Sequence, residues 1–344
     1  MYPNSRAELI RRIAAGVAPD TELLGQNHLA AFAVEATVHE PTIRPRGGAL
    51  RRRVLWNSRE LKIPWEVERD TDVIVTPLAA LLPLAARVRG RQRVLVVNYG
   101  LCTTWERSSA PRRRLLQASL GSAAAIVCLG SSQRTLLLAQ TGLPPDRVVT
   151  IRVGVDERFF APEPPADERE PLVLAVGKDL ARDYTTLAEA LRQLDVPAVI
   201  AALPRNLEAV RLPPRVEAGF VEVRELRELY RRAACVVVPQ RRADYEYGSE
   251  GGGLTALLEA MASARPIVAS ERPVLRDYID DERTALIVPP EDPHALAAAI
   301  ARVLEDRGLA RSLGSTARAR IEDGLTTRHF AAGVASLVKT VAES

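Results

Sequence analysis

The sequence predicts an α/β protein built from two doubly wound domains. Short apolar runs alternate with segments of helical periodicity along all 344 residues. Several runs lack polar alternation, for example Val-Leu-Val-Val at 94–97 and Cys-Val-Val-Val at 235–238, which is typical of parallel strands covered on both faces. Alternation of such strands with helices indicates βαβ units, and the chain is long enough for two domains of ordinary size.

The predicted strands fall into two groups of six. The first group spans 35–39, 53–56, 72–76, 94–98, 124–129 and 148–153, and the second spans 172–176, 198–203, 216–221, 235–239, 266–270 and 285–288. Two helices are predicted before the first strand, over 5–15 and over 19–32 with Asp20 or Thr21 as its cap. Helices are also predicted between the strands, including 133–141 with Ser131 or Ser132 as its N-cap. Three further helices end the chain, the last over 326–341.

A charged, proline-rich segment separates the two groups. Ala161–Pro171 has no periodicity and is interpreted as the interdomain linker. We therefore predict an N-terminal domain over 1–158, a C-terminal domain over 159–325, and a final helical segment over 326–344. Because residues 5–15 are already helical, the first strand of the N-terminal domain is expected to be reduced or absent.

Composition excludes several functional classes. Only three of the 47 basic residues are lysines, so arginine richness indicates coding bias, and no nucleic-acid-binding signature is present. The three cysteines, Cys102, Cys128 and Cys235, are scattered, which indicates buried thiols in a reducing, cytoplasmic compartment. The polar N-terminus is no signal peptide. The longest apolar run, Pro77–Ala86, is too short to span a membrane.

The stretch from Tyr247 to Ser270 carries the strongest chemical signal. Three glycines, Gly251, Gly252 and Gly253, precede a helical pattern with one apolar face. Such a loop presents free N–H groups at the positive end of a helix dipole, which is a site for phosphate. Thr255 and Glu259 share another face, where a carboxylate can accept ribose hydroxyls. The structural alternative is a glycine turn before an amphipathic helix whose solvent face carries Glu259.

This order of glycine loop, Leu-Thr, Leu-Glu-Ala-Met-Ala and Pro-Ile-Val-Ala-Ser resembles the nucleotide-sugar site of glycosyltransferase family 4, which has the GT-B fold. That family carries two glutamates separated by seven residues, and Glu259 matches the second, which binds ribose. Gly251 stands at the position of the first. Glu250 lies one residue earlier and is the candidate for the catalytic contact with the donor sugar.

A second segment strengthens the resemblance. Gly177-Lys-Asp-Leu-Ala-Arg182 follows the predicted strand at 172–176, where the family places two cations that hold the donor diphosphate. Lys178 matches the first cation and Arg182 the second, with two surface cations as the alternative. The resemblance also implies a nucleobase-framing loop around Val221. Asn98 and Tyr99 stand near the position of a family histidine that touches the donor sugar, at the end of a buried strand.

The resemblance covers Ala124 to Glu322 well and the residues before it poorly. It implies a GT-B fold of two Rossmann-like domains facing a cleft, with the last helix crossing back to the first domain. The implied activity is a retaining, metal-independent hexosyl transfer from a UDP or GDP sugar, without another cofactor, to a small-molecule, glycan or lipid-linked acceptor. The implied catalytic residues are Lys178, Arg182 and Glu250, and the implied substrate-binding residues are Asn98, Tyr99, Gly177, Val221, Gly252, Gly253, Leu254, Thr255 and Glu259.

Two other functions stay open. A sugar-nucleotide epimerase would need acid and base side chains in the cleft, whereas the chain has only four histidines. A catalytically weak or inactive GT-B partner or binding protein is favoured by the displaced first glutamate, the absent histidine and the thin first strand. The basic helix start at Pro111–Arg114 leaves peripheral contact with anionic lipid open.

Overall fold

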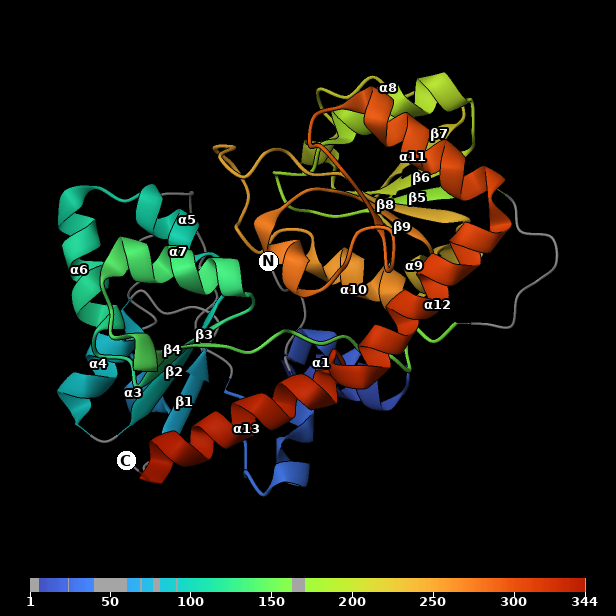
Figure 1. Cartoon of the computed structure of the whole chain (residues 1–344). Coiled ribbons are helices and arrows are strands. Elements are labelled where there is room, and N and C mark those ends of the chain that lie inside the picture. The colour runs from blue at the N-terminus through green and yellow to red at the C-terminus, as the bar shows by residue number, and fades with distance from the viewer. Residues whose placement is uncertain are drawn as a thin grey trace. The chain divides into compact units, whose positions relative to one another are not determined.

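The computed structural model describes residues 6–23, 25–39, 61–68, 70–76, 81–90, 92–162 and 171–343. The chain divides into two compact units (Figure 1). Unit 1 comprises Met1–Glu8, Gln26–Arg152 and Phe330–Ser344, and unit 2 comprises Leu9–Gly25 and Val153–His329. The boundaries predicted at 158 and 325 both fall inside unit 2. The placement of Leu9–Gly25 in unit 2 is not anticipated by the sequence.

Unit 1 is built on a parallel sheet of order β1-β2-β3-β4. Its strands are β1 (Val73–Thr76), β2 (Arg93–Asn98), β3 (Ala125–Cys128) and β4 (Val148–Thr150). Four helices pack on one face through a shared apolar core: α4 (Leu82–Arg89), α5 (Leu101–Glu106), α6 (Ala110–Leu120) and α7 (Ser131–Thr141). α3 (Ile63–Glu66) lies against α4. On the other face, α13 (Thr327–Glu343) packs Val341 against Leu95 and Ala125.

Unit 2 is built on a parallel sheet of order β10-β9-β8-β5-β6-β7. Its strands are β5 (Val173–Val176), β6 (Ala198–Ala201), β7 (Val216–Gly219), β8 (Cys235–Val238), β9 (Ile267–Ser270) and β10 (Leu286–Val288). The chain starts at central β5, runs outward to β7, and then returns to β8 on the other side. This is a doubly wound sheet whose order reverses between β5 and β8, where ligands bind outside the carboxyl ends of the strands.

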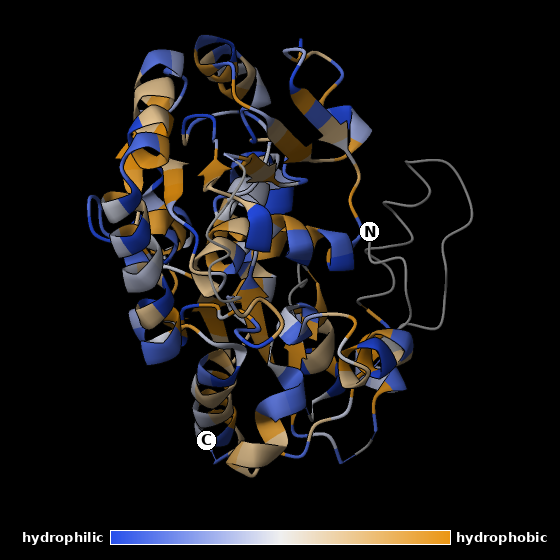
Figure 2. Cartoon of the chain, turned by 90° about the vertical axis from the view of Figure 1, so that its right-hand side faces the viewer, coloured by the Kyte–Doolittle hydropathy of each residue, from blue (hydrophilic) through white to orange (hydrophobic). Residues whose placement is uncertain are grey.

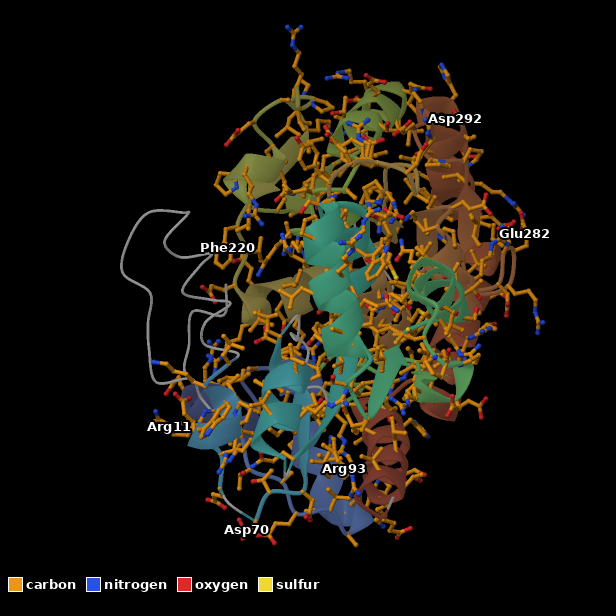
Figure 3. All side chains as sticks on the ribbon, turned by 90° about the vertical axis from the view of Figure 1, so that its left-hand side faces the viewer. Arg11, Asp70, Arg93, Phe220, Glu282 and Asp292 are labelled. Atoms are coloured by element: carbon orange, nitrogen blue, oxygen red, sulfur yellow. The ribbon has the colours of Figure 1, made fainter. Side chains whose placement is uncertain are left out.

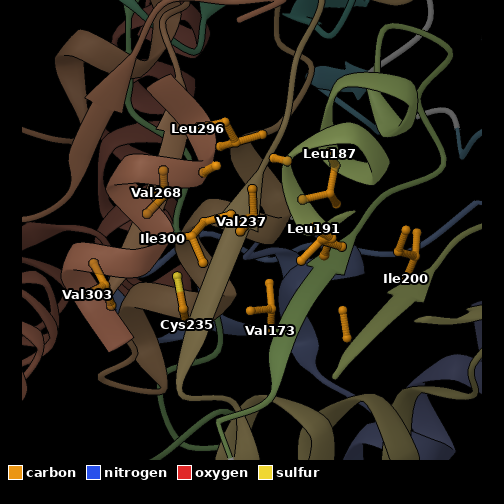
Figure 4. Close-up of a cluster of buried hydrophobic side chains, with 14 of the residues drawn as sticks. Val173, Leu187, Leu191, Ile200, Cys235, Val237, Val268, Leu296, Ile300 and Val303 are labelled. Atoms are coloured by element: carbon orange, nitrogen blue, oxygen red, sulfur yellow. The ribbon is translucent and has the colours of Figure 1, made fainter. Parts of the chain in front are cut away.

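Helices cover both faces of the unit 2 sheet (Figure 1). α8 (Tyr184–Leu194) and α11 (Pro293–Glu305) pack on one face, where residues such as Val237, Leu191 and Ile300 form the core (Figure 4). α9 (Val223–Arg232) and α10 (Leu254–Ala262) lie on the other face, and α12 (Arg307–Gly324) packs against α10. The strands carry mostly hydrophobic residues and the outer helices are mixed (Figure 2), as burial on both sheet faces requires.

The predicted strands from residue 72 onward correspond to β1–β10 and are confirmed. The strand predicted over 35–39 is wrong, because these residues pair with no other described strand. The strand over 53–56, residues 1–4 and most of the linker lie outside the described residues. The first and the last three predicted helices are confirmed as α1 (Arg6–Ala14), α11, α12 and α13.

Two local predictions in the first half are also wrong. The helix expected over 19–32 consists of two 3₁₀ segments, η1 (Asp20–Leu23) and η2 (Gln26–Phe32), separated by Gly25 at φ +70°, which an α-helix does not accommodate. Thr21 accepts through its hydroxyl from the Asp156 N–H instead of capping a helix. The N-cap of α7 is Gly130, which has no side chain to donate or accept. No helix within the described ranges combines the length and apolar character needed to cross a bilayer.

Candidate nucleotide-sugar site

The reversal point of the unit 2 sheet brings two loops together. One follows β5 and contains Gly177–Asp183, and the other follows β8 and runs from Pro239 to Gly253. An isolated β-bridge pairs Arg182 with Gln240, and the adjacent Arg241 N–H donates to the Ala181 carbonyl at 2.8 Å. Two segments far apart in the sequence, the predicted cation loop and the predicted glycine loop, therefore form one site at the carboxyl ends of β5 and β8.

The N-terminus of α10 opens into this site. Gly253 is its N-cap at φ +98°, and a Cβ there would lie 2.1 Å from Gln240 Nε2, so the position requires glycine. The Leu257 N–H donates to Gly253 O at 3.0 Å and closes the first turn of α10, which leaves the earlier amides of Leu254 and Thr255 outside the helical ladder. The Gly252 N–H donates to Ser249 O at 3.0 Å, so that amide is already used.

The apolar face predicted for α10 is buried, and burial extends around nearly all of the helix. Every residue of the helix except Thr255 is buried, because β8 and β9 cover one side while α9 and α12 cover others. Thr255 is the exposed exception. Glu259 is only 7% exposed. The structural alternative, in which Glu259 lies on a solvent face, is therefore wrong.

Arg182 is the side chain that most clearly indicates a ligand. It is 7% exposed, and its Nε and Nη1 have no hydrogen-bond partner among the described residues. A Cβ on Gly177 would lie 2.1 Å from Arg182 Nε, so the glycine makes room for the guanidinium. A buried cation with unused donors is destabilising unless an anion completes its hydrogen bonds. The alternative of two surface cations is excluded for Arg182, whereas Lys178 is exposed.

The Glu259 carboxylate is held by a tyrosine on α9. Its Oε2 accepts from the Tyr230 hydroxyl at 2.8 Å, and no other hydrogen bond to it is present in the described part of the chain. The pKa of Glu259 is raised from 4.5 to about 7, chiefly by burial and in addition by the charge of Glu22, against the lowering by the hydrogen bond from Tyr230 and by the charges of Lys178 and Arg182. Both predicted cations therefore lie close enough to the Glu259 carboxylate to affect its pKa. The other carboxylate oxygen, Oε1, is available to a ligand.

The remaining predicted residues of unit 2 surround this group. Glu250 is half-buried, and its charge raises the pKa of Arg272 against the lowering caused by burial. Val221 is half-buried in the loop between β7 and α9. Phe220 beside it is 56% exposed (Figure 3), and Lys178 Nζ lies 5.7 Å from the centre of its ring. An exposed aromatic ring is the better candidate for contact with a base, and the sequence analysis overlooked it.

Asn98 and Tyr99 belong to unit 1. Asn98 is fully buried, and its Oδ1 accepts from the amides of Gly100 at 3.1 Å and Leu101 at 2.8 Å, so it fixes the turn into α5. Its Nδ2 faces the Sγ atoms of Cys102 and Cys128, each at 3.7 Å. Tyr99 is half-buried. A donor-sugar contact by either residue stays a prediction, and for Asn98 it would require exchanging these internal bonds.

Sequence reasoning missed three side chains that shape the site: Tyr230, Asp179 and Arg272. Each acts through a partner distant in the sequence, so no local pattern marks it. Phe220 had a local signal, since an aromatic residue between a strand and a helix cap is unusual in a loop. Among the described residues, no group of three or more His, Cys, Asp and Glu side chains is arranged to hold a metal ion.

Comparison with known proteins agrees with this geometry. The family model described as "Glycosyl transferases group 1" matches residues 208–320, which include β8, α10 and β9. Sucrose-phosphate synthase from Thermosynechococcus elongatus superposes with a TM-score of 0.72 at 24% identity, over 94% of this chain and 92% of that one. The chain has the GT-B fold, and residues 208–320 are similar to the group 1 glycosyltransferases. The assignment to family 4 within the GT-B proteins stays a prediction.

Two curated relatives carry glycosyltransferase names. D-inositol 3-phosphate glycosyltransferase of Kineococcus radiotolerans is 29% identical over 244 residues, covering 57% of this GT-B chain and 53% of the relative. GDP-mannose-dependent alpha-(1-6)-phosphatidylinositol monomannoside mannosyltransferase of Mycobacterium tuberculosis is 27% identical over 278 residues, covering 73% and 71%. The chain thus spans about half the length of the first of these relatives.

Proposed function

We propose that this protein is a glycosyltransferase that moves a sugar from a nucleoside-diphosphate donor to an acceptor. The observation that carries the proposal is Arg182, a buried guanidinium with two unused nitrogens, beside the first turn of α10 at the reversal point of a doubly wound sheet. A helix N-terminus and a buried cation together favour an anion with several oxygens. A diphosphate satisfies both.

The residues then divide by the part of the donor that they serve. Arg182, Lys178 and the amides of Gly253, Leu254 and Thr255 hold the diphosphate. Glu259 accepts from the ribose hydroxyls through its free Oε1. The loop at Phe220 and Val221 receives the base, and Glu250 serves the sugar. The donor is a UDP or GDP sugar, and a GDP-mannose-dependent relative supports the second.

These groups would act by stabilising the negative charge that develops on the diphosphate. As the bond between the sugar C1 and the diphosphate oxygen breaks, negative charge grows on the departing diphosphate. Donors fixed beforehand around that charge lower the barrier, typically by about 2.7–4 kcal/mol for one well-placed donor. We propose transfer with retention of configuration, without a metal, in the cytoplasm, where the buried free thiols suit a reducing environment. The acceptor stays open among small molecules, glycans and lipid-linked sugars.

A thermal-unfolding panel tests the donor proposal. Each of UDP, GDP, ADP and their glucose or mannose conjugates is added to the wild-type protein and to Arg182→Ala. A ligand at 100 times its dissociation constant stabilises a protein by about 2.7 kcal/mol, so one base should stand out for the wild type and weaken for the variant. Arg311→Ala, at an exposed position of α12, is the matched control. If no nucleoside diphosphate raises the unfolding temperature of the wild type, the proposal is wrong.

One observation favours a second candidate, a nucleotide-binding GT-B protein without turnover. Gly251 occupies the position at which the resemblance implies a glutamate. Product analysis with the stabilising donor separates the candidates. Transfer or slow hydrolysis of the donor supports the enzyme, an altered sugar without acceptor supports an epimerase, and an unchanged donor supports the binding protein.

A further inference from the structure

One carboxylate fastens the two loops of the site to each other. Asp179 lies between Lys178 and Arg182, and its Oδ1 accepts from the Ala181 N–H at 2.8 Å within its own loop. Its Oδ2 accepts from both the N–H and the hydroxyl of Ser249, each at 3.2 Å, in the loop that follows β8. Ser249 stands two residues before Gly251, the first of the three glycines that lead into α10. Asp179 therefore joins the cation loop to the glycine loop.

The far side of the glycine loop is fixed as well. The Arg272 guanidinium donates to Ser249 O at 3.3 Å and to the carbonyls of Arg241 and Arg242 at 3.1 and 3.0 Å. The Gln240 side chain donates to Gly252 O at 2.6 Å. Ser249 is thus held through its N–H and hydroxyl on one side and through its carbonyl on the other.

Asp179 is packed tightly against the backbone of the β8 loop. A Cβ on Gly248 would lie 2.4 Å from Asp179 Oδ1, and one on Gly252 would lie 3.3 Å from Asp179 Cγ. The backbone of the β8 loop thus approaches the Asp179 side chain as closely as glycine permits. The Asp179 carbonyl in turn accepts from Asn206 Nδ2 at 3.0 Å, so the carboxylate projects from an anchored backbone.

The charge of Asp179 has the wrong sign for a direct role in binding phosphate. A carboxylate between two cations weakens the positive potential offered to a diphosphate. The geometry and the charge of Asp179 therefore predict opposite effects on diphosphate binding when its carboxylate is removed. If geometry dominates, the loops separate and diphosphate binding weakens. If charge dominates, diphosphate binding tightens.

We propose that Asp179 is a positioning residue that holds the β5 loop and the glycine loop at the spacing a diphosphate requires. This inference rests on the proposed nucleotide-sugar function and deepens it. The residue acts through Ser249 and Ala181 and does not touch the donor. A carboxamide has only one acceptor oxygen, so Asp179→Asn cannot serve the amides of Ala181 and Ser249 together.

The test compares dissociation constants by titration calorimetry for a nucleoside and its diphosphate, uridine with UDP and guanosine with GDP. Asp179→Asn should weaken the diphosphate at least tenfold and leave the nucleoside within threefold. Ser249→Ala keeps the backbone bond and loses only the hydroxyl bond, so its diphosphate affinity should fall less than threefold. Asp244→Asn makes the same chemical change in the β8 loop, at an exposed side chain that pairs with Arg242 at 3.4 Å, and should match the wild type.

The outcomes separate the two proposals. If the wild type binds UDP or GDP while Asp179→Asn binds it as tightly or more tightly, the positioning role is wrong and the donor site stands. If the wild type binds neither, both are wrong. If Asp179→Asn does not fold, the proposal is tested by hydrogen exchange on the wild-type protein without ligand. The amides of Ala181 and Ser249 should both be protected, and exchange of either at the rate of an open chain would overturn the role of Asp179.

Discussion

Replacing Glu259 by glutamine should stabilise the free protein at neutral pH and should lower its affinity for a nucleotide. Burial raises the pKa of Glu259 from 4.5 to about 7. Between these values the folded state retains a proton that the unfolded chain has released. The contribution of Glu259 to folding stability therefore falls as pH rises through this window, and it is constant above it.

The magnitude follows from the two pKa values. A rise from 4.5 to about 7 corresponds to roughly 3 kcal/mol of lost stability once the carboxyl is ionised. Glutamine does not titrate, and its carbonyl can still accept from the Tyr230 hydroxyl. The difference in unfolding free energy between Glu259→Gln and the wild type should be near zero at pH 4.5 and should grow to roughly 3 kcal/mol in favour of the variant at pH 8.

Urea unfolding of both proteins at half-unit steps from pH 4.5 to pH 8 measures this difference. Glu322→Gln is the control, because Glu322 is exposed and pairs with Arg318 on its own helix. Glu259→Gln should also bind a nucleoside less tightly than the wild type does, since an amide cannot accept from two ribose hydroxyls as a carboxylate does. A difference that does not change with pH would show that Glu259 is already ionised in the free protein, and the reasoning would fail.

Three further predictions concern the same site. Tyr230→Phe removes the hydrogen bond that lowers the pKa of Glu259, so the fall in stability should move to higher pH in the same urea series, and no move would contradict the assigned role. Gly253→Ala forces an L side chain to φ +98° against Gln240 Nε2 and should cost about 1–3 kcal/mol in urea unfolding, whereas Ala262→Gly near the other end of α10 should cost about 1 kcal/mol or less. Phe220→Ala should weaken a nucleoside and its diphosphate by the same factor of about ten, because stacking on an aromatic ring contributes roughly 1–3 kcal/mol per base; calorimetry showing a loss for the diphosphate alone would contradict contact with the base.

Strands β5, β8 and β9 of unit 2 could be predicted because each buries a largely apolar run. Residues Cys235–Val238 are all buried in β8, and no amphipathic pattern competes with that reading of the run. Residues 35–39 (Glu-Ala-Thr-Val-His) alternate polar and apolar side chains, as a half-buried strand does, but find no strand partner among the described residues. Pairing is a property of the whole sheet, so a local pattern could not decide between these two cases.

The site was predictable where its residues stand next to structural signals. Lys178, Arg182 and the glycines each follow a strand or precede a helix, and the resemblance supplied their grouping. The burial of Glu259 was not predictable, because α9 and its Tyr230 cover a face of α10 that the sequence pattern left for solvent. The bond from Ser249 to Asp179 joins residues 70 positions apart. Such contacts depend on the completed sheet.

The central claim is that Arg182 and the first turn of α10 exist to bind a diphosphate. The most direct measurement is the calorimetric affinity of wild type and Arg182→Ala for a nucleoside and for its diphosphate at pH 8. The wild type should bind the diphosphate about 100-fold more tightly than the nucleoside, or more, as several charge-assisted hydrogen bonds would give. Arg182→Ala should lose most of this difference in affinity. Equal affinity of the wild type for both ligands, or an unchanged preference in Arg182→Ala, would contradict it.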